Sequence, residues 1–586
     1  MAGDVSPARV CGALFMMMAA AVGYALGAPE PSGPAPAGLP RPKADLLLLH
    51  GTVLTMDRAS TVAEAVAVAG DAIVAVGSDP EIKALAGPAT RVIDLQGRTL
   101  LPGFIDSRVT GPFGFWELEA GPALVDSGGS PLAQPEEIEA RLREWLAAHK
   151  PAPYVWVVGS GFDPRAATSK KFDRAFADRA APDNPLVLMS LDHHAVLLNS
   201  RASDLVGLKD MDYPRGSGEV GLDAQRRPTG LVRETPAFLV MNRVWGLLPE
   251  TARRAATVRF FETASRFGIT TVGSTLAVPA DLLMDEGLLK LGEMPVRVVA
   301  GAFGPNEEAR RALEDYRSKG RSPDRDRLMV GPALYPLDGS PIGWGAALFQ
   351  AYEGAPWTSG TLTMPPEDVD RRIASWAAGR DSLVLEASGS LAVHMILDAT
   401  ERAPRTGERP SLLRADGLQI IAAPDRDRLV RLAERGVVVS LQPTLFPYRV
   451  FIEEAIGKER MKDALPYRSL VEAGIPVAIN SDWPMAAQTF QPLQIIEWAV
   501  TRTGWRPEEA LTVEQSLRAY TADAARAIGI EDRVGSIEAG KKADLVVLDR
   551  NPMRAALATD SISGIPVRMT LSGGSVVFED RRAAAH

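Results

Sequence analysis

Residues 101–110 have the sequence LPGFIDSRVT, and the rest of the chain is interpreted around this stretch. The pair Pro102–Gly103 predicts a turn, because these two residues interrupt regular structure. The apolar residues on both sides of the turn predict a buried strand. Polar side chains come at its end, at Asp106, Arg108 and Thr110.

Short apolar strands alternate with helical patterns between about residues 104 and 530. The expected strands include 154–158, 186–189, 296–300, 384–385, 437–441 and 477–479. The expected helices are 135–149, 251–267, 366–379 and 425–435. Repeated strand–helix units predict an α/β fold with a parallel sheet, and at this length a (β/α)8 TIM-like barrel over 104–530. Catalytic and binding residues are then expected at the carboxyl ends of the strands.

Both ends of the chain are rich in predicted strands. They lie at 46–49, 65–68, 72–77 and 91–95 near the start, and at 545–548 and 570–578 near the end. Turn residues separate these runs, which is typical of β-hairpins. We therefore expect segments 44–103 and 531–581 to form one composite β-sandwich beside the barrel.

The N-terminus differs from the rest of the chain. Arg9 precedes an apolar run over 10–28, and a Pro/Gly/Ala-rich linker follows at 29–43. This pattern predicts an export signal over 1–28 and a periplasmic or secreted protein. An uncleaved anchor helix is the alternative, because the run is almost long enough to span a bilayer. Cys11, the only cysteine, lies in this leader, so the rest of the chain has no disulfide and no thiolate ligand.

Size and charge limit the partners. The 586 residues exceed one compact core, which predicts at least two domains. The net charge is -9, with both signs mixed along the chain. This charge disfavours nucleic acid or an anionic membrane as a partner. A small-molecule substrate or ligand is expected, no membrane partner is expected beyond an uncleaved leader, and a homodimer is left open.

A series of motifs in register covers nearly all of the chain after the leader. They are WVVGSGFDP (156–164), DHHAVLLNS (192–200), RRPTGLVRE (226–234), DGSPIG (338–343), GVVVSLQP (436–443), NSDWP (480–484), LRAYTADAARAIG (517–529) and GSIEAGKKADLVVLD (535–549). Together with residues 101–110 they resemble the amidohydrolase superfamily, in the N-substituted formamide deformylase branch (amidohydrolase family 3). The resemblance implies hydrolysis of carbon–nitrogen bonds in amides with zinc or another divalent metal.

The resemblance also implies where metal ligands should stand. The family strand that matches 104–110 ends in Asp-(Ser/Ala)-His-x-His, and Arg108 and Thr110 occupy its two histidine positions. Leu334 matches a lysine that can bridge two metals, while Glu386 and Ile420 match two further histidines. A divalent ion needs imidazole and carboxylate ligands. No metal ligand set and no cofactor are therefore predicted for this chain.

Asp482 matches the family aspartate that takes the proton of the attacking water and passes it to the leaving nitrogen. A strand-end aspartate that only holds a loop is the alternative interpretation. His194 and Glu234 match residues of the family's substrate pocket, and Asp338, which opens DGSPIG at another strand end, is assigned to the same pocket. His193 and His194 should point in opposite directions, which disfavours joint ligation of one ion.

Arg108 is a permanent cation at a former ligand position. Buried carboxylates without a counter-charge are costly, so we expect the Arg108 guanidinium to pair with Glu386, Asp482 or both, in place of the metal. Arg108 and Glu386 are therefore assigned to the pocket.

Three functions remain open from the sequence. The first is an inactive relative or a small-molecule binder. The second is an active hydrolase of a small amide, with a rebuilt site that uses Asp482, Glu386 and His194. The third is an ordinary metal-dependent amidohydrolase whose metal site has not been recognised.

Overall fold

A computed structural model describes residues 43–581, except residues 128, 405–410, 486, 488 and 556–560. The predicted leader (1–28) and all of the predicted linker except Lys43 lie outside the described residues. Within the described ranges, no helix has both the length and the apolar character needed to span a bilayer.

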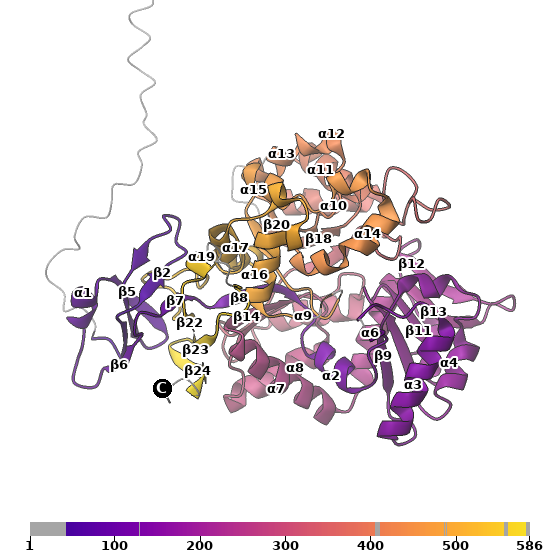
Figure 1. Cartoon of the computed structure of the whole chain (residues 1–586), viewed down its shortest axis with the longest axis horizontal. Helices are drawn as coiled ribbons and strands as arrows, with labels where there is room; N and C mark the ends of the chain where they lie inside the picture. Colours follow the sequence, from indigo (N-terminus) through magenta and orange to yellow (C-terminus); the bar gives the residue numbers. More distant parts are fainter. Residues whose placement is uncertain are drawn as a thin grey trace, which may run out of the picture. The chain divides into compact units, whose positions relative to one another are not determined.

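The two ends of the chain meet in a six-stranded sheet. In spatial order it contains β24 (Ser575–Glu579), β23 (Val567–Ser572), β22 (Leu545–Leu548), β7 (Thr99–Pro102), β2 (Thr52–Leu54) and β3 (Val62–Ala63). The C-terminal β22 pairs antiparallel with the N-terminal β7, and Figure 1 shows the yellow strands beside the indigo ones. This pairing places residues more than 400 positions apart in one sheet.

A second sheet near the N-terminus has four strands. Its order is β5 (Ala72–Gly77), β4 (Ala65–Ala69), β1 (Leu46–Leu49) and β6 (Arg91–Asp94). Apolar side chains of both sheets form one cluster, in which Leu48 and Val66 pack with Leu545 and Leu571. The two terminal segments thus share a core.

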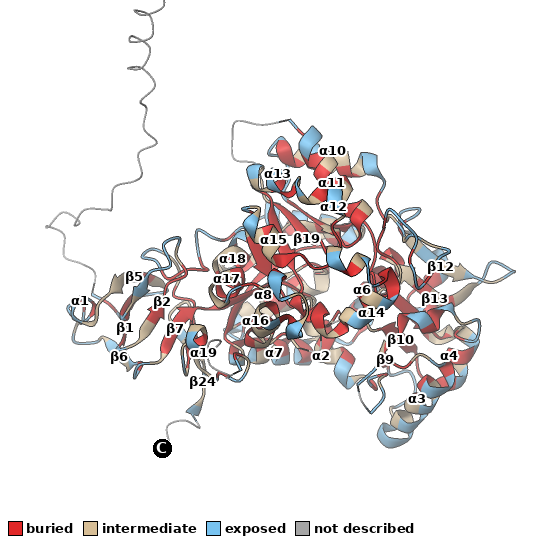
Figure 2. Cartoon of the chain, turned by 45° about the horizontal axis from the view of Figure 1, so that its top comes forward, coloured by how far each residue is buried: buried red, intermediate tan, exposed pale blue. Residues whose placement is uncertain are grey.

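Two parallel sheets form the centre of the fold. The first is ordered β16 (Leu328–Val330), β15 (Arg297–Ala300), β14 (Ile269–Ser274) and β8 (Phe104–Val109). The second is ordered β17 (Ala333–Pro336), β18 (Leu383–Ala387), β19 (Leu413–Gly417), β20 (Val438–Leu441) and β21 (Val477–Ile479). Figure 2 shows buried strands around β19, as expected for parallel strands covered by helices.

Backbone hydrogen bonds join the two parallel sheets at both edges. At one edge, the Asp482 N–H donates to the Arg108 carbonyl at 3.0 Å, and the Thr110 N–H donates to the Trp483 carbonyl at 2.9 Å. At the other edge, the Leu334 N–H donates to the Ala302 carbonyl at 2.9 Å. The carboxyl end of β8 therefore lies beside the segment that follows β21.

The expected helices are present with small shifts. Helix α3 is Pro135–His149, α7 is Glu250–Arg266 and α10 is Pro366–Ala377. The expected helix at 425–435 is instead two short helices, α12 (Ala423–Arg426) and α13 (Leu429–Glu434). The apolar residues of this segment recur with a helical period, but the helix is interrupted between Arg426 and Leu429.

A third, mixed sheet was not foreseen. Its order is β12 (Gly218–Leu222), β13 (Pro228–Glu234), β11 (Ala195–Leu198), β10 (Leu186–Ser190) and β9 (Val157–Phe162). The strands expected at 154–158 and 186–189 as part of the barrel belong here, because β10 turns back antiparallel to β11. Periodicity identifies a buried strand but does not say which sheet it joins.

Candidate functional site

The carboxyl end of β8 contains an irregularity that directs its polar side chains. Val272 of β14 pairs with Asp106, and Ser274 pairs with Val109, so β8 has one extra residue between them. Such a bulge re-aims side chains at the end of a strand. Asp106 accepts hydrogen bonds from the Ser481 N–H at 3.1 Å and the Tyr520 hydroxyl at 3.2 Å. Burial raises the pKa of Asp106 to about 6 despite these bonds.

Arg108 lies among three carboxylates that come from three other strand ends. Its Nη1 is 2.7 Å from Glu386 Oε1, and its Nε is 2.8 Å from Asp482 Oδ1. Nη1 is also 3.6 Å from Asp416 Oδ2. The expected pairing of Arg108 with both Glu386 and Asp482 is therefore confirmed. The N–H directions are not aligned for hydrogen bonds, so these contacts are ion pairs at close range.

Burial strengthens the electrostatics of this cluster. The side chains of Arg108, Glu386 and Asp482 are 8%, 13% and 17% exposed. Burial raises the pKa of Asp482 to about 7, against the opposing effect of the Arg108 charge. Burial lowers the pKa of Arg108, but the carboxylates around it outweigh burial and raise it, so the guanidinium stays charged. Asp482 can therefore exchange a proton near neutral pH while Arg108 cannot.

A second buried arginine supports this cluster and was missed in the sequence. Arg414 Nε and Nη2 donate to the two oxygens of Asp416 at 2.7 and 2.9 Å, and Nη1 donates to the Ser107 carbonyl at 3.0 Å. Arg414 and Asp416 are two residues apart on β19, so they share one face of the strand. That spacing was the available signal.

His194 forms the second part of the site. It follows β10, and its Nδ1 is 2.6 Å from Glu234 Oε2 at the end of β13. Burial lowers the pKa of His194, but the charge and hydrogen bond of Glu234 outweigh burial and raise the pKa to about 9. His194 is therefore an imidazolium at neutral pH. The His194 charge lowers the pKa of Asp482, and the Glu386 charge raises the pKa of His194. His194 therefore lies within electrostatic range of both carboxylates.

His193 makes a separate pair. Its Nε2 is 2.9 Å from Glu117 Oε1 in α2 (Pro112–Glu119), and both side chains are 3% exposed. The two adjacent histidines thus have different partners. This pair was also missed, because Glu117 lies 76 residues earlier in the chain.

Asp338 holds loops together. Its carboxylate accepts from the backbone N–H groups of Ser388 at 2.9 Å, Gly389 at 2.7 Å and Ala347 at 2.9 Å. Burial raises the pKa of Asp338 to about 8 even though three donors favour its ionised form. The same loop packs on Glu234, because a Cβ added at Gly345 would collide with the Glu234 carboxylate. Asp338 therefore positions the loop beside Glu234.

Backbone strain also marks the site. Asp482 and Glu234 have left-handed φ angles of 53° and 57°. Residues with a Cβ rarely adopt this conformation, and such strain concentrates at functional sites.

The remaining former ligand positions hold side chains that are apolar or are weak metal ligands. Thr110 lines a small cavity with Phe113, and Leu334 is 1% exposed within an apolar cluster. Ile420 lies three residues beyond the end of β19 and lines a separate cavity of about 580 Å³. Strand β19 ends at Gly417, so Ile420 lies in the loop between β19 and α12.

These residues do not fit the divalent metal that the sequence resemblance implies. In the described part of the chain, no group of three or more His, Cys, Asp or Glu side chains is arranged to hold a metal ion. The carboxylates of Glu386 and Asp482 both contact the Arg108 guanidinium. The Arg108 charge would repel a divalent ion placed among these carboxylates. Arg108 and Thr110 also stand where the family has two histidines, so β8 offers no imidazole to bind the ion.

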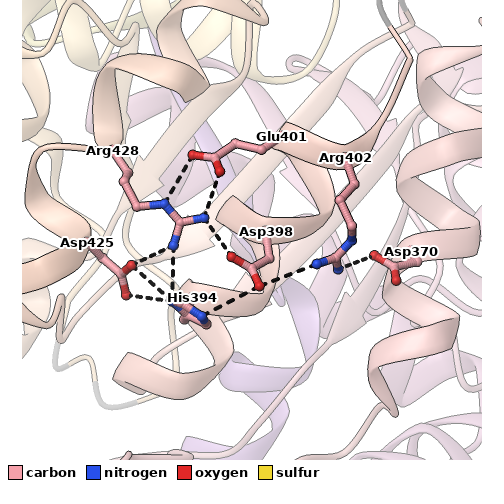
Figure 3. Close-up of polar contacts among 7 residues, drawn as sticks. All are labelled: Asp370, His394, Asp398, Glu401, Arg402, Asp425 and Arg428. Atoms are coloured by element: carbon pink, nitrogen blue, oxygen red, sulfur yellow. Dashed lines mark hydrogen bonds and ion pairs between the residues drawn. The ribbon is translucent and has the colours of Figure 1, made fainter.

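His394 belongs to a surface network away from this cluster. Its Nδ1 is 2.9 Å from Asp425 Oδ1, and Arg428 Nη1 donates to the same carboxylate at 2.8 Å (Figure 3). Arg428 also contacts Asp398 and Glu401 on α11 (Ser390–Arg402). The network fastens α11 to the segment after β19.

Comparison with known proteins adds the context of relatives. A family model described as "Amidohydrolase family" matches residues 91–578. The N-substituted formamide deformylase of Arthrobacter pascens is 28% identical over 555 residues, covering 91% of this chain and 98% of that protein. The putative amidohydrolase YtcJ of Bacillus subtilis is 25% identical over 566 residues, covering 90% and 98%.

Solved structures are similar in fold. An uncharacterized metal-dependent hydrolase from Pyrococcus horikoshii has a TM-score of 0.68 at 20% identity, with 89% of this chain and 99% of that chain covered. An adenosine deaminase from Xanthomonas campestris with bound zinc has a TM-score of 0.52 at 16% identity, covering 92% and 94%. At these identities the likeness concerns the α/β fold alone.

Proposed function

The chain belongs to the amidohydrolase family, and on this premise we propose that it binds a small molecule at the Arg108 cluster and does not hydrolyse amides at a divalent metal. Relatives in this family hydrolyse amide bonds. The observation that carries the proposal is the position of the Arg108 guanidinium between Glu386 and Asp482. An inorganic cation and this guanidinium would compete for the same carboxylates.

The proposal includes the closed form of the fold. Hydrogen bonds join β8 to the segment after β21, and the segment after β15 to β17. These bonds support a (β/α)8 barrel in which β8, β14, β15 and β17–β21 form the ring, with the two terminal sheets as a β-sandwich beside it. In a barrel, the carboxyl ends of all strands converge, which brings Arg108, Glu386 and Asp482 together.

Arginine cannot replace a metal in catalysis. A divalent ion lowers the pKa of bound water to about 7 and keeps a coordination position open for it. A guanidinium stays protonated and has no such position. The metal-activated water of the family therefore has no counterpart at this guanidinium, which favours binding over hydrolysis at a divalent metal.

The chemistry of the site favours an amide-like ligand. An amide carbonyl oxygen accepts hydrogen bonds, and an amide N–H donates them. The His194 imidazolium can donate, while the carboxylates of Asp482 and Glu386 can accept. Each of these three side chains is 13–17% exposed, so a ligand can reach part of each.

A second candidate function rests on one specific observation. The pKa of Asp482 is about 7, which suits a general acid or base at neutral pH. An active, metal-independent hydrolase with Asp482 as the acid/base and with Glu386 and His194 placing the substrate is therefore the alternative.

Metal content and ligand binding test the proposal together. Purified wild type is analysed for metals by plasma mass spectrometry, then screened with amides and formamides for binding by calorimetry and for turnover with and without a chelator. Asp482→Ala is compared with Asp532→Ala, an exposed aspartate outside the site. We expect substoichiometric metal, no turnover, and binding that Asp482→Ala weakens at least tenfold while Asp532→Ala leaves it unchanged.

The alternatives give different results. Turnover that is insensitive to chelator and lost in Asp482→Ala supports the metal-independent hydrolase. One zinc per chain with turnover abolished by a chelator refutes both metal-independent functions.

A further inference from the structure

A cavity of about 440 Å³ lies between two helices outside the Arg108 cluster. One wall is α9 (Glu307–Ser318), which follows β15, and the other is α10 with the turn that leads into β18. Residues 330–333 and Tyr335 form its floor. Small-molecule sites are clefts of roughly 300–1,000 Å³, so the cavity has the size for such a ligand.

Arginine dominates the charged residues of this cavity. Five arginines line it, against three carboxylates. The arginines are Arg310, Arg317, Arg371, Arg372 and Arg380. Because the whole chain has a net charge of -9, this concentration of cations is local. The field in such a cavity attracts anions.

Three of these arginines have no ion-pair partner in the part of the chain that the structure describes. Arg310 pairs with Glu307 and Glu314, and Arg371 pairs with Asp368. Across the described residues, no carboxylate lies within ion-pair distance of the other three, which are Arg317, Arg372 and Arg380. Their guanidinium groups therefore remain available to an external anion.

Arg372 is held in place without being satisfied. Its Cζ is 3.5 Å from the centre of the Tyr335 ring, which fixes the plane of the guanidinium. Its Nε is buried and has no hydrogen-bond partner among the described residues. A buried donor without a partner costs free energy, and an oxyanion in the cavity would remove that cost.

We propose that this cavity, the arginine groove, binds a small-molecule polyanion that carries phosphate or carboxylate groups. Guanidinium groups bind both kinds of oxyanion through paired N–H donors. Two facing walls of arginine favour a ligand with at least two anionic groups over a single-charge ion. The groove is a second ligand site, and none of its lining residues is Arg108, Glu386, Asp416 or Asp482.

Binding of two simple polyanions tests the groove. Pyrophosphate and citrate are titrated into the full chain by calorimetry at constant ionic strength, with sodium chloride as the reference. The groove variant is Arg317→Gln/Arg380→Gln, whose exposed side chains can be changed with little risk to folding. The control Arg143→Gln/Arg468→Gln removes the same charge from helix positions elsewhere, where the two side chains are 66% and 40% exposed. Urea midpoints verify that both variants are folded.

We expect one saturable site in the wild type, at least tenfold weaker binding in the groove variant, and unchanged binding in the control. Affinity should also fall as sodium chloride increases, because salt screens exposed charges. Preference for pyrophosphate identifies a phosphate-bearing ligand, and preference for citrate a polycarboxylate; both support the proposal. Absence of saturable binding of either anion to the wild type, or equal weakening in the control, overturns it.

Discussion

Replacement of Arg108 by methionine is the most direct test of the central cluster. Methionine fills a similar volume but removes the charge. Glu386 and Asp482 then lie 13% and 17% exposed without their main counter-charge. Asp416, which is fully buried, keeps its pair with Arg414. The variant thus isolates the contribution of the Arg108 guanidinium.

The expected loss is large because the carboxylates are mostly buried. Removal of one partner of a buried ion pair costs about 3–5 kcal/mol. We expect the free energy of unfolding at pH 8 to fall by about this amount in Arg108→Met. Arg143→Met removes an exposed arginine that pairs with Glu139 on α3, and there we expect a change below about 1 kcal/mol.

The loss should depend on pH with a definite sign. The pKa of Asp482 is raised from 3.8 to about 7, so the folded state holds this proton more tightly than the unfolded state. The stability linked to Asp482 is therefore present below pH 3.8 and is lost as pH rises through 7. Arg108 opposes this rise in the wild type, so its removal raises the pKa of Asp482 further. Each additional pKa unit adds about 1.4 kcal/mol to the loss at high pH.

Urea unfolding of both variants at pH 5 and pH 8 measures this effect. The deficit of Arg108→Met relative to wild type should shrink at pH 5, where its unpaired carboxylates can be protonated. Adding Glu386→Gln and Asp482→Asn to Arg108→Met should recover much of the deficit at pH 8. A variant as stable as wild type at pH 8, or a deficit identical at both pH values, would refute the reasoning.

Two further changes test the surroundings of the cluster. The pKa of His194 is raised to about 9, so its contribution to stability is present below about pH 6.5 and is lost as pH rises through 9. Between pH 6.5 and pH 9.5, the free energy of unfolding in urea should therefore fall less in Glu234→Gln than in wild type. Equal decreases in the two proteins would contradict the assigned pair of His194 and Glu234. Arg297→Met should cost about 3–5 kcal/mol in the same assay, because it leaves the buried Asp544 of the terminal segment without its partner at 2.6 Å. A cost below about 1 kcal/mol would show that this pair does not stabilise the contact between the terminal sheet and β15.

Local elements follow from the sequence with good accuracy. Strands β1, β4 and β5 and helix α3 were predicted within one residue of their bounds. Each is defined by apolar periodicity and turn residues inside a short window. The single helix predicted over 425–435 is two helices in the structure. Apolar periodicity does not show whether a helix is interrupted.

The central ion pairs were predictable for a different reason. Arg108, Glu386 and Asp482 each follow a predicted parallel strand, and the carboxyl ends of such strands meet at one edge. Asp416 and Arg414 were missed because β19, which carries both residues, was not among the predicted strands. His193 and Glu117 were missed because α2 and β10 meet only in the folded chain.

The amino-acid sequence by itself determined the family, the succession of strands and helices, and the kind of charge at each strand end. Tertiary structure decided which strands share a sheet, how the bulge in β8 turns Arg108, and which carboxylates surround its guanidinium. The physical reason is the separation along the chain over which each feature is encoded. Periodicity, turns and charge type are encoded within a few neighbouring residues, whereas ion pairs between Arg108 and Asp482 depend on strand contacts across more than 370 residues.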